Sequence, residues 1–193
     1  MTLLIAGLIV FLGVHSVRIF ADGWRSAQIA KMGLGPYKGV YSLASALGLA
    51  LIVVGFGQAR MAPIPLWDAP LWMRHLTALL MLFAFVLLAA AYVPRNRIKA
   101  SVRHPMILSV KIWAAGHLMA NGMLADALLF GAFLLWAVVD YRAARMRDRV
   151  NGRIGNRPTL AGDVATIIVG VVLWAAFALY LHAWLIGVRP FVT

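Results

Sequence analysis

The sequence predicts an all-α fold, a polytopic integral membrane bundle of about six transmembrane helices. Of the 193 residues, 63% are hydrophobic and only 12% are charged, and the mean hydropathy is +0.88. Soluble domains are closer to half apolar. Apolar runs of membrane-spanning length recur along the chain, and neither a strand-like alternation nor a glycine-rich phosphate loop interrupts them. We expect residues 1–193 to form a single transmembrane domain.

Six segments have the length and composition of transmembrane helices, since a bilayer core of about 30 Å needs roughly 20 apolar residues in a helix. They comprise residues 2–20, 39–57, 72–93, 104–120, 123–142 and 163–187. No basic region precedes the first segment, so we expect it to stay in the membrane rather than to be cleaved as a signal peptide. Only Asn121 and Gly122 separate the fourth segment from the fifth, which predicts a helical hairpin.

Two of the connecting segments have a character of their own. Residues 21–38 combine Trp24, Ile29 and Met32 with basic side chains, which predicts a short helix lying on the membrane surface. Residues 143–160 are rich in arginine and contain Asn-Gly and Arg-Pro breaks, which predicts a solvated loop.

The Lys and Arg residues are divided unequally between the two ends of the predicted bundle. Of the 18 present, most lie in the first, third and fifth connections. These are Arg18, Arg25, Lys31, Lys38, Arg95, Arg97, Lys99, Arg103, Arg142, Arg145, Arg147, Arg149, Arg153 and Arg157. The opposite end has only Arg60, Arg74 and Arg189, and Lys111 falls inside a helix. Because short cytoplasmic loops carry the excess of basic residues, the first, third and fifth connections are predicted to be cytoplasmic and both termini to face the other side.

The net charge and the absence of cysteine limit which partners the protein can bind and which ligands it can offer to a metal. The net charge of +12 arises from basic residues placed between apolar runs, so anionic membrane lipids are the expected partner and nucleic acid is not. The chain has no cysteine, which excludes disulfides and any thiolate-ligated metal or haem.

The predicted topology separates the five histidines by depth in the membrane. His75, His104 and His182 lie near helix ends, where an imidazole can reach water. Arg-His-Pro at 103–105 is a plausible helix start, with proline in the first turn. His15 and His117 lie about 18 Å and about 20 Å along their helices, at roughly 1.5 Å per residue. Both are therefore expected inside the hydrocarbon layer.

A polar group at that depth needs a partner, and the residues leave two interpretations open. Each imidazole could bond a neighbouring carbonyl or hydroxyl within the bundle. Alternatively, His15 and His117 could be the axial ligands of one haem between the first and fourth helices, since imidazole suits iron. Their predicted heights differ by roughly 5–10 Å, within the uncertainty of helix ends. His104 and Lys111, seven residues apart, share a helix face and predict a polar strip running inward.

Three motifs resemble those of the NnrU family, which is related to the plant and cyanobacterial 15-cis-ζ-carotene isomerases. They are Val-His-Ser at 14–16, Arg-His-Pro at 103–105 and Lys-Ile-Trp-Ala-Ala-Gly-His-Leu-Met-Ala-Asn-Gly at 111–122. The similarity covers nearly the whole chain. It implies a bacterial inner-membrane protein and, from the isomerase branch, haem b held by the histidines that match His15 and His117. NnrU proteins are associated with denitrification and nitric oxide metabolism.

One position departs from the isomerase pattern. The isomerases have a cysteine three residues before the second histidine, proposed to replace that histidine when the iron is reduced, and here the residue is Ala114. The resemblance therefore supports haem b while it leaves the isomerase mechanism without its exchanging ligand. Met119 and Met123 are the nearest soft side chains that could substitute.

Four further residues are expected at the predicted haem site. Haem propionates need cationic or interfacial partners, because a bare carboxylate in hydrocarbon costs several kcal/mol. Arg18 follows His15 by one turn and Lys111 lies on the fourth helix, so we expect one of them to serve the propionates. Trp113 and Met119 are expected to line the cavity.

Several functions are compatible with these residues. One is a haem-dependent cis-trans isomerase acting on a hydrophobic polyene. Another is a haem redox or nitric oxide-sensing protein that supports nitric oxide reduction. A membrane methyltransferase is less well supported: the Arg-His-Pro motif resembles the R-H-P-x-Y-x-G signature, but Ile107 and Ser109 replace its tyrosine and glycine. A non-catalytic assembly factor is the fourth.

Overall fold

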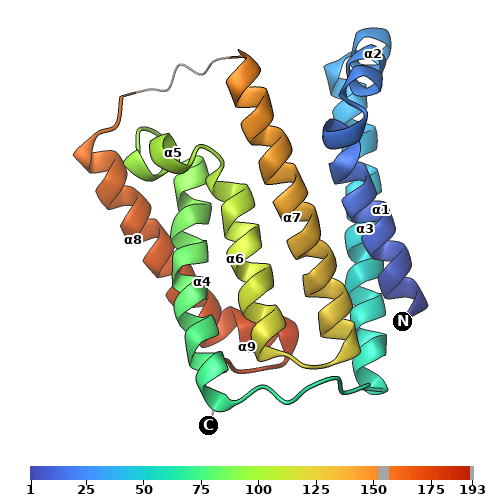
Figure 1. Cartoon of the computed structure of the whole chain (residues 1–193), viewed down its shortest axis with the longest axis vertical. Helices are drawn as coiled ribbons and strands as arrows, with labels where there is room; N and C mark the ends of the chain where they lie inside the picture. The colour runs from blue at the N-terminus through green and yellow to red at the C-terminus, as the bar shows by residue number, and fades with distance from the viewer. Residues whose placement is uncertain (152–156, 192–193) are drawn as a thin grey trace.

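The computed structural model describes residues 1–151 and 157–191, and nearly all of them are helical (Figure 1). Within these ranges one isolated β-bridge, between Pro65 and Met123, is the only extended pairing. The elements in chain order are α1 (Thr2–Phe20), α2 (Asp22–Met32), α3 (Leu34–Met61), α4 (Leu71–Tyr92), α5 (Arg97–Val102), α6 (Pro105–Ala120), α7 (Leu124–Asn151), α8 (Leu160–Ala176), the π-helical turn η1 (Phe177–Leu181) and α9 (His182–Ile186).

Within the described ranges, five helical segments are long and apolar enough to cross a membrane. They are α1, α3, α4, α7 and the continuous stretch from Leu160 to Ile186, and α6 is a shorter apolar helix of 16 residues. The predicted all-α, polytopic membrane bundle is therefore confirmed. In a bilayer each backbone N–H and C=O must be satisfied inside its own segment, which is why apolar stretches of this length fold as helices.

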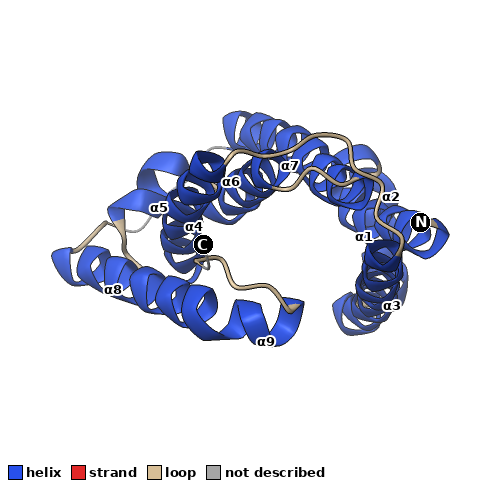
Figure 2. Ribbon diagram, turned by 90° about the horizontal axis from the view of Figure 1, so that it is seen from below, coloured by secondary structure: helices blue, strands red, loops and turns tan. Residues whose placement is uncertain are grey.

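The helices pack side by side in the order α3, α1, α7, α6, α4 and α8. Seen along the bundle, this order forms an arc, and α9 lies across the open side of the arc (Figure 2). The guanidinium of Arg60, in the last turn of α3, donates to the carbonyl oxygen of Ile186 in α9 at 2.9 Å. This hydrogen bond connects the two ends of the arc near the chain termini.

The predicted hairpin of the fourth and fifth segments is confirmed, because α6 and α7 pack against each other across a short connection. The backbone N–H groups of Leu66 and Trp67 donate to the carbonyl oxygen of Gly122 at 2.8 and 3.2 Å. A Cβ atom at position 122 would collide with the carbonyl oxygen of Trp67. Glycine at this turn therefore allows the loop after α3 to lie directly against the hairpin.

The helix boundaries differ most from the prediction in two places. The second predicted transmembrane segment, 39–57, is part of a longer helix, α3, which runs from Leu34 to Met61. Residues 143–151 belong to α7, so the solvated loop predicted for 143–160 is wrong over this stretch. The helix continues past the apolar run because its charges have partners, as in the pair between Arg147 and Asp140 (3.7 Å). Arg153 lies outside the described residues.

The basic connections gather at one end of the bundle. The start of α1 and helix α9 lie towards one end, whereas α2, α5 and the end of α7 lie at the other (Figure 1). Residues 22–32 form the predicted short helix, which packs against α1 and α3. The grouping of the connections is as predicted, and which end faces the cytoplasm stays a prediction.

This sidedness can be tested with single cysteines, because the chain has none of its own. Met61, at the end of α3, and Val150, near the end of α7, are 79% and 84% exposed and lie at opposite ends. A membrane-impermeant maleimide added to spheroplasts should label Met61→Cys at once and Val150→Cys only after lysis. The reverse pattern would contradict the predicted orientation.

Candidate functional site

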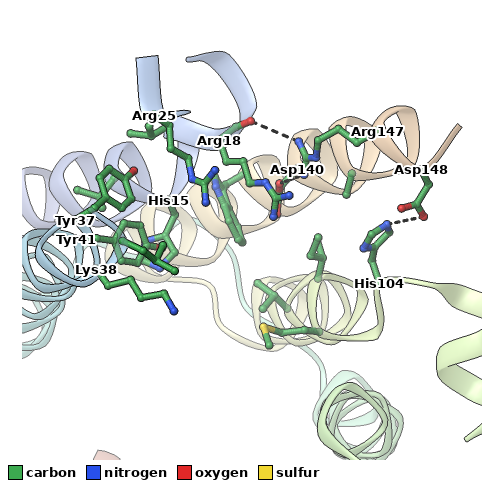
Figure 3. Close-up of a pocket in the computed structure, with 18 residues that line it drawn as sticks. His15, Arg18, Arg25, Tyr37, Lys38, Tyr41, His104, Asp140, Arg147 and Asp148 are labelled. Atoms are coloured by element: carbon green, nitrogen blue, oxygen red, sulfur yellow. Dashed lines mark hydrogen bonds and ion pairs between the residues drawn. The ribbon is translucent and has the colours of Figure 1, made fainter. Parts of the chain in front are cut away.

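A cavity of about 580 Å³ lies at the basic end of the bundle, where α1, α2, α3, α6 and α7 meet. Its volume falls within the range of small-molecule sites. One part of its lining is apolar: Val14, Val17, Leu34, Met106, Ile107, Val110, Trp136 and Ala144. The polar part is shown in Figure 3 and consists of His15, Arg18, Arg25, Tyr37, Lys38, Tyr41, His104, Asp140, Arg147 and Asp148.

The imidazole of His15 lies on the cavity wall in a fixed orientation. Its Nδ1 is 2.7 Å from the carbonyl oxygen of Phe11, one turn earlier in α1. A carbonyl only accepts, so Nδ1 carries a proton and donates. In the neutral imidazole Nε2 then keeps its lone pair. The ring stacks on Phe11 (centroids 4.2 Å apart), and Trp136 meets it edge-on at 6.0 Å. This geometry resembles that of metal-binding histidines, whose second nitrogen usually donates to a carbonyl or carboxylate.

His117 makes the same kind of hydrogen bond near the C-terminal end of α6, away from the cavity. Its Nδ1 is 2.9 Å from the carbonyl oxygen of Trp113. The ring lies 4.9 Å from Phe130 and 5.6 Å from Trp113. Within residues 1–151 and 157–191, neither His117 Nε2 nor His15 Nε2 makes a hydrogen bond. In each histidine, Nδ1 bonds a neighbouring carbonyl oxygen, as the first of the two interpretations expects, and Nε2 stays available.

Aromatic rings separate the two histidines. The ring of Phe11 lies 5.7 Å from that of Phe133, which in turn lies 5.4 Å from Trp113. These residues come from α1, α7 and α6, and α7 packs against both other helices. His15 lies about 8 Å from the end of α1 at Phe20, and His117 lies about 18 Å from the start of α6, at roughly 1.5 Å per residue. His15 lines the cavity, and His117 does not.

Positive charge predominates in the cavity lining. Arg18, Arg25, Lys38 and Arg147 face two carboxylates, Asp140 and Asp148. Arg147 pairs with Asp140 and also donates to the carbonyl oxygen of Arg18 at 3.5 Å. Arg25 has a partner outside the lining, the carboxylate of Asp22 at 3.5 Å. The remaining excess, Arg18 and Lys38, favours an anionic ligand. Of the two predicted propionate partners, Arg18 lines the cavity and Lys111 does not.

The predicted polar strip on α6 faces α7. His104 Nε2 lies 3.0 Å from a carboxylate oxygen of Asp148. The His104 ring also meets Tyr141 edge-on at 6.2 Å, and the ammonium of Lys111 lies 5.3 Å from the centre of the same Tyr141 ring. His104 and Lys111 thus share one face, as predicted. His104 precedes Pro105, the first residue of α6, so the predicted helix start is also confirmed.

Trp113 packs rather than lines the cavity. Its indole contacts Phe130 and Phe133 as well as His117, and it belongs to the periphery of the core cluster formed by Leu4, Leu8, Ile52, Ala59, Ala125, Leu129 and Phe130. Ala114 is fully buried. The sequence-predicted residues that the cavity brings together are therefore His15 and Arg18, joined by His104.

Sequence reasoning missed three residues of this site: Trp136, Asp140 and Asp148. Trp136 Nε1 is buried and has no hydrogen-bond partner within the described ranges. Such an orphaned donor calls for an explanation, and a bound ligand is one. For Asp140 a signal existed, because an acidic residue inside a predicted membrane segment usually marks a functional interior.

The donor set distinguishes between a bare metal ion and a macrocycle. In the described part of the chain, no three His, Asp or Glu side chains lie close enough together to hold a metal ion. A haem supplies four ligands to its own iron and needs only one or two axial side chains from the protein. Of the two imidazoles that line the cavity, His104 pairs with Asp148, whereas Nε2 of His15 is available. His15 is therefore the residue that could serve a haem in this way.

Comparisons with known proteins give one match. The family model described as NnrU protein matches residues 3–190, nearly the whole chain. No curated protein and no solved structure matches it.

Proposed function

Because the chain belongs to the NnrU family, we propose that it is a membrane protein that binds haem b in the cavity, with His15 as an axial ligand. The observation that carries this proposal is the state of His15: Nδ1 is anchored to the Phe11 carbonyl, and Nε2 is available at the cavity wall. We further propose, from the family, that the protein lies in the bacterial inner membrane. The distribution of its basic residues supports the proposal that both termini are periplasmic.

The residues of the cavity fit an amphiphilic, dianionic macrocycle. Apolar side chains such as Val14 and Val110 can contact a porphyrin face, and Arg18, Arg25 and Lys38 can pair with the propionates. Trp136 adds an aromatic side chain to the lining beside His15. Haem b would supply a redox-active iron, while the protein fixes the ligand, neutralises the carboxylates and excludes water.

His117 remains the proposed second ligand, with a condition attached. His117 is outside the cavity lining, and ring contacts through Trp113 and Phe133 connect it to Phe11 and His15. Binding of one iron by both histidines would therefore require these side chains to rearrange. With His15 as the only protein ligand, a bound haem would leave a coordination position for a small molecule. An open position favours gas binding, whereas two histidines favour electron transfer.

These features support a haem redox or nitric oxide-binding role more directly than isomerisation. An exchangeable position opposite His15 suits a diatomic ligand, and the NnrU association with nitric oxide metabolism agrees with it. A polyene isomerase is supported by the related family. Ligand exchange of the isomerase type has no donor at residue 114, where a buried methyl group stands in place of a thiol.

The absorption spectrum tests the proposal. Protein purified from cells supplied with haem should show a Soret band at about one haem per chain. On reduction and exposure to nitric oxide, the band should shift if the position opposite His15 is open. An unchanged spectrum with nitric oxide would instead indicate stable bis-histidine ligation and electron transfer. A colourless protein under these conditions would overturn haem binding.

A further inference from the structure

A histidine and a carboxylate on neighbouring helices form a close pair at the edge of the cavity (Figure 3). His104, which precedes α6, lies 3.0 Å through Nε2 from an oxygen of Asp148 on α7. The two side chains are 20% and 12% exposed. The pair is therefore largely enclosed by protein, and it still lines the space that His15 lines.

In this pair the carboxylate of Asp148 can stabilise a protonated His104. When His104 is protonated, the carboxylate of Asp148 accepts a charge-assisted hydrogen bond from it, and such bonds are roughly twice as strong as neutral ones. Arg103 is a weaker competitor for the same oxygen, with its guanidinium 3.9 Å away. Histidine is also the side chain whose charge changes most readily near neutral pH.

Charges on every surrounding element act on this imidazole. α7 contributes Asp140, Arg147 and the ring of Tyr141, whereas α6 and the turn before it contribute Lys111 and Arg103. α1, α2 and α3 contribute Arg18, Arg25 and Lys38 across the cavity. The cations oppose protonation of His104 and the two carboxylates favour it. Such a balance is sensitive to one unit of charge added inside the cavity.

We propose that His104, held by Asp148, takes up a proton when a haem bound through His15 is reduced. This inference rests on the proposed haem binding and assigns its coupled proton. The bound haem would supply an iron that accepts one electron from an external one-electron reductant, and neutral His104 would accept one proton from the solvent at the ring nitrogen that does not face Asp148. The net charge in the cavity is then unchanged. Charge compensation matters because two unit charges interact strongly where the effective dielectric constant is low.

A redox titration at several pH values tests the coupling. In wild-type protein the reduction potential should fall by roughly 59 mV for each tenfold fall in proton concentration, the value for one proton per electron. His104→Gln should bind haem and lose this dependence over the same range. Asp148→Asn should keep the dependence and move it to lower pH, because the imidazolium loses its carboxylate. His182→Gln, a histidine outside the cavity lining, is the matched control and should behave as wild type.

Two further measurements distinguish a failure of haem binding from a failure of the proton coupling. An indicator dye in weak buffer should record uptake of about one proton per haem when the wild type is reduced, and much less with His104→Gln. In the haem-free protein, the imidazole signal of His104 should titrate differently in Asp148→Asn, which reports the pair without any haem. A colourless wild type overturns haem binding and this coupling with it. Haem bound normally, with equal pH slopes in wild type and His104→Gln, overturns the coupling alone.

Discussion

His15→Ala is expected to remove most or all of the bound haem. His15 presents Nε2 to the cavity while the Phe11 carbonyl holds its other nitrogen, and an alanine leaves the iron without this ligand. The cations of the lining remain in the variant, so any residual haem should be loosely held and spectrally altered. The measurement is haem per chain and the Soret position after purification with haem supplied.

Controls separate loss of a ligand from loss of structure. His182→Ala is the matched control, since the Nδ1 of His182 also contacts a carbonyl oxygen (Val188, 2.7 Å) but the side chain is outside the cavity lining. It should retain haem, as should His75→Ala. Adding free imidazole to His15→Gly should restore binding if the lost group was a ligand. Wild-type haem content in His15→Ala would return His15 to the role of a packing histidine.

His117→Ala decides whether there is a second protein ligand. A loss equal to that of His15→Ala would mean that Phe133 and Trp113 give way and both histidines bind one iron. A normal haem content, with a spectrum that changes on adding nitric oxide, would mean that His15 acts alone. Either result is informative because the aromatic rings, rather than distance in sequence, separate the two imidazoles.

Gly48→Ala is expected to destabilise the bundle and disturb the His15 site together. α1 and α3 approach so closely that a Cβ at Gly48 would lie 2.7 Å from the backbone nitrogen of Phe11 and 2.9 Å from its Cα. Close backbone contact through small residues is a main source of helix association in membranes. Overpacking of this kind costs about 1–3 kcal/mol, and here the displaced residue supplies the carbonyl that orients His15.

Gly57→Ala provides the comparison on the same helix. No atom lies within 4 Å of the position where its Cβ would stand, and alanine is a better helix former than glycine by up to about 1 kcal/mol. Thermal unfolding in detergent should therefore show a lower Tm for Gly48→Ala and an unchanged or higher Tm for Gly57→Ala. Equal melting temperatures would contradict the close α1–α3 contact.

Much of the fold was predictable because the bilayer constrains it strongly. The apolar segments at 2–20 and 72–93 match α1 and α4 within a residue, and Asn121-Gly122 marked the hairpin. The end of α7 was not predictable in the same way. The apolar segment ends at the first arginines, whereas the helix continues to Asn151. Ion pairs such as that between Arg147 and Asp140 stabilise this charged extension.

The sequence by itself determined the class of protein and the family, because each depends on local composition or on a short motif. The depth of His15 and His117 in the membrane stays a prediction. Only the tertiary structure decided that α7 lies between α1 and α6, so that aromatic rings separate the two histidines. It also decided that Trp136, Asp140 and Asp148 join His15 and His104 around one cavity. These neighbours depend on the packing order of helices and on the rotation of each about its axis. Contacts between segments more than a hundred residues apart set both quantities, and no local pattern encodes them.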